Sequence, residues 1–222
     1  MLFVIDFDGT LAKNDSVGVL LEKFASDIWE EIEQEWLNGR ITAVECMQQQ
    51  IRLVKADHIA IENYFRSIEL DDTFLPFYRH VSRFAMVAIV SDGLDHAIHV
   101  ATKYAGLPEI PAYANRLHFV PDGIDISFPH RTAQCNAGNG VCKCAVAHDL
   151  SVTHSGPVIL VGDGKSDACL AHNADVVFAK SSLLNYCRKQ GIPHIPFDTF
   201  DDVLNTVKTW HAHLPLQAAC SA

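Results

Sequence analysis

Short hydrophobic segments recur along the chain at wide spacing, and longer stretches with helical periodicity separate most of them. Each segment is six residues or shorter, a length typical of buried strands, and several are rich in valine and isoleucine. They cover residues 2–5, 85–90, 158–161, 176–178 and, more weakly, 194–196. Because strands that alternate with helices form parallel sheets covered on both faces, we predict an α/β fold with a doubly wound, Rossmann-like parallel sheet.

The stretch between the first two predicted strands is too long for a single crossover helix. It exceeds seventy residues, and its hydrophobic positions keep helical spacing throughout. Residues 42–45, Thr-Ala-Val-Glu, form a capping-box pattern that predicts a helix start, and Asp57 can open another helix. We therefore predict two domains: a core of residues 1–12 and 84–222, and an all-helical cap of residues 13–83 inserted after the first strand.

Two further elements are predicted in the second half of the chain. Hydrophobic and polar residues alternate over residues 115–128, around the turn-forming residues 121–123, Pro-Asp-Gly. This pattern predicts a β-hairpin. Ser181 or Ser182 can cap a later helix that Gly191 closes.

Composition indicates a folded chain with an acidic surface. The 222 residues are 49% hydrophobic and 20% charged, enough for one full core and a smaller unit. The formal net charge of −10 argues against nucleic acid or an anionic membrane as a partner. The longest apolar run, residues 84–90, cannot span a bilayer, and no basic stretch precedes the first strand as a signal peptide would require. We therefore expect a cytoplasmic protein.

Acidic and phosphate-binding residue types follow three of the predicted strands. Residues 6–10 read Asp-Phe-Asp-Gly-Thr, residues 91–93 read Ser-Asp-Gly, and residues 162–167 read Gly-Asp-Gly-Lys-Ser-Asp. In open α/β sheets, ligands bind beyond the carboxyl ends of the strands. One such loop can arise by chance, but three at strand ends predict a functional site.

The charges of this predicted site call for a metal ion. Asp6, Asp8, Asp163 and Asp167 would place four carboxylates in one crevice, opposed by the single ammonium group of Lys143. Without a further cation, such a cluster is costly and protonates in part. Mg²⁺ favours one or two carboxylates, water and a substrate phosphate. The sequence therefore predicts a Mg²⁺ site that accepts a phosphorylated substrate.

Together these motifs, with a lysine about twenty residues before the last of them, resemble the haloacid dehalogenase superfamily. The helical insertion resembles the type-one cap of its phosphoserine phosphatases. Residues 128–144, with Cys135, Cys142, Lys143 and Cys144, are similar to the cysteine-bearing loop of the methionine-salvage phosphatases. That family acts on 2-hydroxy-3-keto-5-methylthiopentenyl-1-phosphate. The resemblance implies a small phosphomonoester as substrate, this one first, then phosphoserine or another small metabolite.

The resemblance also implies a role for each motif. Asp6 is the expected nucleophile, which forms an aspartyl-phosphate, and Asp8 the general acid and then base. Asp6, the main-chain carbonyl of Asp8 and Asp163 would hold Mg²⁺, with Asp167 orienting the metal's waters or ligands.

Phosphate binding is expected from the second and third motifs. Ser91 and the backbone N–H groups of Asp92 and Gly93 would bind phosphoryl oxygens, and only the backbone of Asp92 is expected to matter. Lys143 would neutralise charge beside the nucleophile. Lys165 is the alternative lysine, but the spacing favours Lys143.

Two charged cap residues are candidates for contacting the rest of the substrate. Asp15 lies nine residues after Asp6, in the neighbourhood of the substrate-sensing glutamate of phosphoserine phosphatases. Arg52 could meet a substrate carboxylate. Both also fit ordinary surface charges. The cap matches the methionine-salvage family at little beyond residues 14–15.

The cysteines and histidines leave other interpretations open. Cys135, Cys142 and Cys144 could bind zinc with His130, but their spacing lacks the usual CxxC pairs, and reduced thiols are the simpler interpretation. His96, three residues before another histidine on a predicted helix, fits a solvated face. A phosphoryl-transferring mutase and a non-enzymatic metal-binding module are the rival functions.

Overall fold

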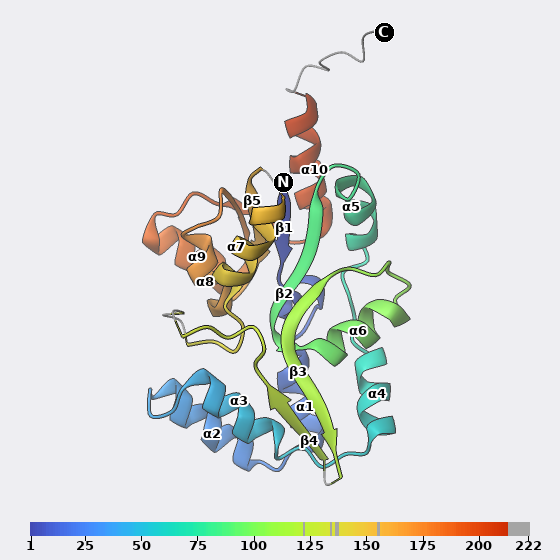
Figure 1. Ribbon diagram of the computed structural model, residues 1–222, viewed down its shortest axis with the longest axis vertical. Coiled ribbons are helices and arrows are strands. Elements are labelled where there is room, and N and C mark those ends of the chain that lie inside the picture. The colour runs from blue at the N-terminus through green and yellow to red at the C-terminus, as the bar shows by residue number, and fades with distance from the viewer. Residues whose placement is uncertain (122, 134, 136–137, 155, 213–222) are drawn as a thin grey trace.

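The computed structural model describes residues 1–212 except 122, 134, 136–137 and 155, and its centre is one seven-stranded sheet (Figure 1). The strand order is β4-β3-β2-β1-β5-β6-β7, and all neighbours run parallel except the β3–β4 pair. The strands are β1 (Leu2–Ile5), β2 (Met86–Leu94), β3 (Ala112–Val120), β4 (Gly123–Ser127), β5 (Val158–Gly162), β6 (Val176–Ala179) and β7 (Ile195–Pro196). The predicted α/β fold with a doubly wound parallel sheet is confirmed.

Helices cover both faces of this sheet and extend beyond one end of it. Helices α5, α6 and α10 pack on one face, whereas α7, α8 and α9 pack on the other (Figure 1). The helices are α1 (Ser16–Phe24), α2 (Ile28–Leu37), α3 (Ala43–Ile51), α4 (His58–Arg66), α5 (Phe74–Val81), α6 (Asp95–Tyr104), α7 (Lys143–Thr153), α8 (Ala168–Ala171), α9 (Ser181–Gln190) and α10 (Phe200–Ala212). Within the described ranges, no helix is both long and apolar enough to cross a membrane.

Strand β1 is central to the core because it is buried on both faces. Phe3 and Ile5 join the cluster beneath α5 and α10, whereas Leu2 and Val4 join the cluster beneath α7 and α9. All four side chains are fully buried. Period-two alternation sends successive side chains to opposite faces, so a continuous hydrophobic run is what a strand covered on both sides requires.

The predicted hairpin is present, and the predicted helix after β6 is capped differently from expectation. Leu117 pairs with Ile126 in the antiparallel β3–β4 ladder, and the expected turn includes residue 122, which lies outside the described residues. Helix α9 ends at Gly191, whose φ of +68° is the left-handed conformation of a helix stop. Neither serine caps its start: Ser182 Oγ donates instead to the carbonyl of Asp163.

Helices α1–α4, which we call the cap helices, lie between β1 and β2 in the chain. The capping box of Thr42 and Glu45 opens α3, and the Asp57 carboxylate accepts the Ala60 N–H at the start of α4. Their apolar faces share one cluster with residues of the hairpin and of α6, so the cap helices are buried against core elements as well as against one another.

Helix α5 falls inside the predicted cap segment but packs with the core. Phe74 and Phe77 are fully buried, and their ring centroids lie 4.8 and 5.1 Å from that of Phe200 on α10. Two chain segments connect the cap helices to the core, one before α1 and one after α4. They meet at an isolated antiparallel bridge of Ala12 with Leu70. We propose that the cap ends at this bridge and that α5 belongs to the core domain.

This packing predicts how truncation of α5 affects stability. Phe77→Ala should lower the free energy of unfolding by about 3–5 kcal/mol, because it removes a buried ring and leaves a cavity under the sheet. Ile59→Ala on α4 is the control, since this side chain is 69% exposed and should change stability by less than about 0.5 kcal/mol. Urea unfolding measures both, and equal effects would contradict the assignment of α5 to the core.

Candidate active site

The three polar motifs meet at the carboxyl ends of β1, β2 and β5. Strand β1 lies between the other two in register, with Ile5 opposite Ile89 on one side and Val161 on the other. Asp6 follows β1 directly and therefore sits at the middle of this edge. A cavity of about 500 Å³ opens there, lined by residues of all three motifs and of the cap helices.

Asp6 is held in a buried charge cluster. Lys143 Nζ donates to Asp6 Oδ1 at 2.7 Å and to Asp167 Oδ1 at 2.6 Å, and all three side chains are at least 95% buried. Burial, and then the Asp167 carboxylate, raise the pKa of Asp6 well above its usual value, against the opposing effect of Lys143. Burial disfavours the charged form of Lys143, but the two carboxylates outweigh it and raise the pKa of its ammonium group. Lys143 therefore stays charged beside the carboxylates.

The structure brings together a set of carboxylates suited to a hard cation. One oxygen each from Asp6, Asp163 and Asp167 lie within 4.8 Å of one another. Asp167 is the least available of the three, because its Oδ2 accepts the N–H groups of Asp163 and Gly164 and its Oδ1 accepts from Lys143. Oxygen donors in this number and of this type fit Mg²⁺.

Two glycines allow the motif loops to approach these carboxylates closely. A Cβ on Gly9 would lie 2.5 Å from Asp163 Oδ2, and the φ of +71° at Gly9 also disfavours a side chain. A Cβ on Gly93 would lie 2.4 Å from Asp8 Oδ2. Glycine at both positions therefore has a steric reason.

Asp8 lies beside the start of α1, apart from the Lys143 cluster. Its Oδ1 accepts the Ser16 N–H at 2.7 Å. Burial, with the nearby Asp15 carboxylate, raises the pKa of Asp8 to about 7. A carboxyl group with this pKa can carry a proton near neutral pH, which a general acid requires.

The second motif contributes a side chain that sequence reasoning underrated. The Asp92 carboxylate accepts the Val141 N–H at 2.9 Å, so it fixes the loop that leads to Lys143. Asn115 Nδ2 donates to the Asp92 carbonyl at 2.6 Å, and this fully buried asparagine was missed because it lies within an ordinary hairpin pattern. Ser91 is also buried, and its Oγ accepts the Gly93 N–H at 3.0 Å.

The fourth-motif lysine has a different position from Lys143. Lys165 lines the cavity, and its Nζ lies 5.8 Å from the ring centroid of Trp36 on α2. This cation–π geometry connects the motif loop to the cap. Lys143, as the spacing favoured, is the lysine in contact with Asp6.

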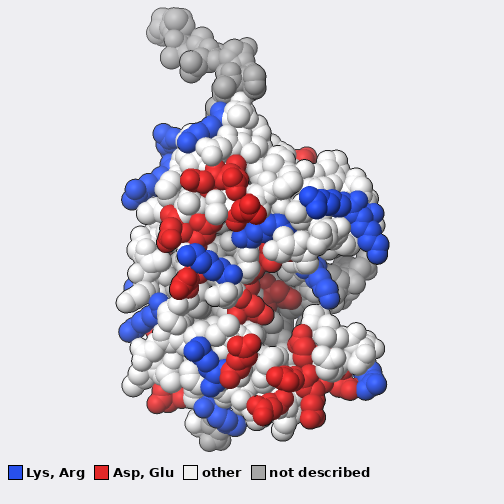
Figure 2. All heavy atoms as spheres, turned by 180° about the vertical axis from the view of Figure 1, so that it is seen from behind, with Lys and Arg blue, Asp and Glu red and all other residues white. Residues whose placement is uncertain are grey.

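The cap side of the cavity combines apolar and acidic surfaces. Acidic side chains gather over the lower part of the molecule, where α2 and α3 lie (Figure 2). Asp15 lines the cavity and caps α1, its Oδ1 accepting the N–H groups of Val17 and Gly18. The other cap residues that line the cavity are Val17, Gly18, Leu21, Glu22, Trp29, Glu33, Trp36, Ala43, Cys46, Met47 and Gln50.

Arg52 does not occupy the position that the sequence suggested. Its Nε and Nη2 donate to the carboxylate of Asp125 on β4 at 3.1 and 3.2 Å, and it is not among the residues that line the cavity. The guanidinium group therefore ties the end of α3 to the hairpin and does not line the cavity.

The cysteine loop does not gather zinc ligands in the part of the chain that the structure describes. No three of the thiols and His130 have donor atoms mutually within 4.8 Å. The Cys144 thiol instead donates to Cys169 Sγ at 3.1 Å, and burial raises the pKa of Cys144 to about 12. These positions favour reduced thiols that pack the loop beside Lys143.

Similarity to known proteins agrees with this geometry. A model of the family described as Putative Phosphatase matches residues 1–212. The 2-hydroxy-3-keto-5-methylthiopentenyl-1-phosphate phosphatase of Bacillus pumilus is 31% identical over 216 residues, covering 92% of either chain. The protein of the same description from Exiguobacterium sp. is 30% identical, covering 90% of this chain and 94% of that one.

Solved structures show the same fold. A phospho-aspartyl intermediate analogue of phosphoserine phosphatase has a TM-score of 0.67 at 19% identity, covering 92% of this chain and 97% of that one. A HAD family hydrolase from Salmonella enterica serovar Typhi has a TM-score of 0.71 at 19% identity, covering 91% and 69%. Because the family model and the curated relatives span nearly the whole chain, this protein belongs to the Putative Phosphatase family.

Proposed function

We propose that this chain hydrolyses a small phosphomonoester with Mg²⁺, through an aspartyl-phosphate formed on Asp6. The observation that carries the proposal is the position of Asp6: at the end of the central strand, in contact with Lys143, and facing a cavity shared with the cap. A carboxylate so placed can attack phosphorus, while a neighbouring ammonium group stabilises charge that develops in the transition state.

The two halves of the reaction use the same two carboxyl groups. An Asp6 oxygen attacks phosphorus as the bond to the leaving oxygen breaks, and Asp8 donates its proton to that oxygen. Asp8 then accepts a proton from water, whose oxygen attacks the phosphorus of the aspartyl-phosphate. Phosphate leaves and Asp6 is regenerated, so atoms and protons balance over the cycle.

The remaining residues would hold the metal and the phosphate. Asp6, the main-chain carbonyl of Asp8 and Asp163 would hold Mg²⁺, and Asp167 would position Lys143 and the Asp163 loop. When bound, Mg²⁺ supplies positive charge against the carboxylates and the phosphate. The Ser91 hydroxyl and the backbone N–H groups of Asp92 and Gly93 would donate to the phosphoryl oxygens. The Gly93 N–H, which now donates to Ser91 Oγ, would exchange that bond for one to the phosphate.

The first-choice substrate is 2-hydroxy-3-keto-5-methylthiopentenyl-1-phosphate. We propose the cytoplasm as the place of the reaction. The curated relatives that carry this substrate in their descriptions support the choice. The cap supports it independently, because Trp29 and Met47 give the cavity an apolar wall. A methylthio group buried there would be removed from water.

An amine-bearing phosphomonoester such as phosphoserine is the second candidate. Asp15, Glu22 and Glu33 line the cavity and would favour an ammonium group. For the carboxylate of phosphoserine, Lys165 is the one cation among the described lining residues, and it lies over Trp36. Three cap carboxylates against one ammonium group would repel the carboxylate of phosphoserine. We therefore rank the methylthio substrate above phosphoserine.

A nucleophile substitution tests the chemistry. Asp6→Asn keeps the side-chain shape but removes the nucleophilic oxygen, so turnover should fall at least about a hundredfold while the fold persists. Asp72→Asn is the matched control, because this carboxylate is almost fully exposed and should leave turnover unchanged. Phosphate release and circular dichroism measure both effects. Residual activity above a hundredth of the parent would count against Asp6 as nucleophile.

Metal removal tests the cofactor. Chelation by EDTA should abolish phosphate release, and Mg²⁺ should restore it, because the carboxylates and the substrate phosphate then share a cation. Ca²⁺ should inhibit, since its larger and more variable coordination shell misplaces the attacking carboxylate. Full activity in metal-free buffer would refute the assignment.

A panel of small phosphorylated metabolites tests the substrate and separates hydrolysis from mutase activity. The methylthio substrate should release free phosphate with the highest kcat/KM. Met47→Ala should lower kcat/KM for that substrate about tenfold, mainly through KM, and hardly affect p-nitrophenyl phosphate. Arg52→Ala, the control in the same cap, should change neither. An equal loss on both substrates would remove Met47 as a specificity residue, and phosphoryl transfer without free phosphate would favour a mutase.

A further inference from the structure

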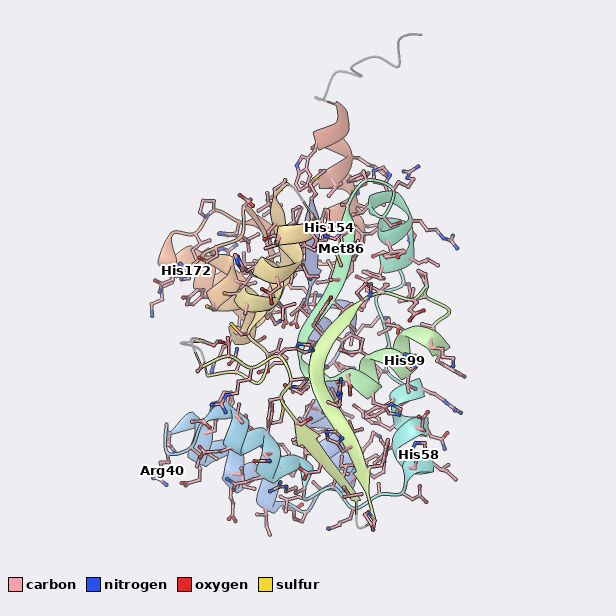
Figure 3. The ribbon with its side chains drawn as sticks, in the orientation of Figure 1. Arg40, His58, Met86, His99, His154 and His172 are labelled. Carbon is pink, nitrogen blue, oxygen red and sulfur yellow. The ribbon has the colours of Figure 1, made fainter. Side chains whose placement is uncertain are left out.

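A second group of metal-binding side-chain types lies outside the catalytic cavity, between a cap helix and a core helix. His58 and Glu62 are one turn apart on α4, and His96 is near the start of α6. Figure 3 shows α4 and α6 next to each other, with His58 and His99 labelled on them. One donor atom from each of His58, Glu62 and His96 lies within 4.8 Å of the other two.

The donor atoms converge on one carboxylate oxygen. His96 Nε2 lies 2.7 Å from Glu62 Oε1, and His58 Nε2 lies 3.9 Å from the same atom. Phe119 of β3 supports both rings, with centroid distances of 4.3 Å to His58 and 5.4 Å to His96. Two imidazoles and a carboxylate are therefore already gathered, with their donor atoms within 4.8 Å of one another.

The surroundings leave room for an ion to enter. The side chains of His58, His96 and Glu62 are 57%, 29% and 18% exposed, so solvent reaches the group from one side. Arg66 is the arginine paired with Glu62, and its Nη2 lies 3.6 Å from the other carboxylate oxygen, Oε2. Oε1 is therefore not paired with Arg66, and its hydrogen-bond partner is His96, another member of the same group.

We propose that His58, Glu62 and His96 form a second metal site, for a divalent transition-metal ion of the zinc type. Two imidazoles and one carboxylate suit zinc and its neighbours, whereas Mg²⁺ prefers oxygen ligands. Binding requires the neutral tautomers of His58 and His96 whose proton is on Nδ1, so that each Nε2 offers its lone pair to the ion, and water completes the coordination. Because its ligands come from α4 and α6, the ion joins the cap to the core.

Zinc binding and thermal unfolding test the site. Chelator-stripped protein in excess Mg²⁺ is titrated with Zn²⁺ against a chromophoric chelator, for the parent, His58→Ala and His96→Ala. The parent should bind one equivalent more than either variant, and Zn²⁺ should raise its Tm by several degrees more. Zinc held by the cysteines or by the catalytic carboxylates is common to all three proteins and cancels in the difference.

His99→Ala is the matched control, because His99 lies on the same helix three residues from His96 and outside the ligand group. It should bind Zn²⁺ as the parent does, and the double variant His58→Ala/His96→Ala should lose no more zinc than either single variant. Equal stoichiometry and equal Tm shifts in the parent and His96→Ala would overturn the proposal and leave an ordinary His96–Glu62 hydrogen bond. Loss of the same equivalent in His99→Ala would also overturn it.

Discussion

The buried contact of Lys143 with Asp6 and Asp167 is the interaction on which the rest of the site depends. It joins the end of β1, the start of α7 and the loop after β5, three segments far apart in the sequence. Removing one partner from a buried ion pair typically costs about 3–5 kcal/mol, because the other charge is left without compensation. Two buried carboxylates share one ammonium group, so net negative charge is left away from water. The cluster therefore favours a further cation, and that cation in turn favours an anionic substrate.

The neighbouring elements keep this cluster in place. Asp167 binds two backbone N–H groups of its own loop, and Asp92 binds the Val141 N–H just before Lys143. Gly9 and Gly93 let two carboxylates approach the backbone more closely than any other residue would permit. The site is therefore organised by hydrogen bonds and close packing before a substrate arrives, which is how fixed charges stabilise a transition state without reorganisation.

The cap helices are attached to this rigid edge by contacts of different strength. Their apolar cluster continues into the hairpin and α6, whereas Lys165 over Trp36 and Arg52 with Asp125 are half-exposed contacts that break at small cost. This arrangement separates the two tasks. In the proposed reaction, the core residues would act on the phosphate, which every substrate shares, and the cap wall would contact the part of the substrate that differs. A cation between α4 and α6 would hold the cap against the core without contacting the residues proposed to act on the phosphate.

The sequence by itself determined the sheet, its hairpin and the catalytic edge, because strand periodicity and the order of strand-end motifs depend only on local residue types. It also favoured Lys143 over Lys165 by spacing. Only the tertiary structure decided which side chains meet across the chain. Arg52 faces Asp125 on the hairpin, α5 packs under the sheet with α10, and Asn115 supports the second motif, none of which has a local signature. The same holds for His58 and His96, whose approach depends on how α4 packs against α6, because contacts between distant segments are set by packing geometry that periodicity does not encode.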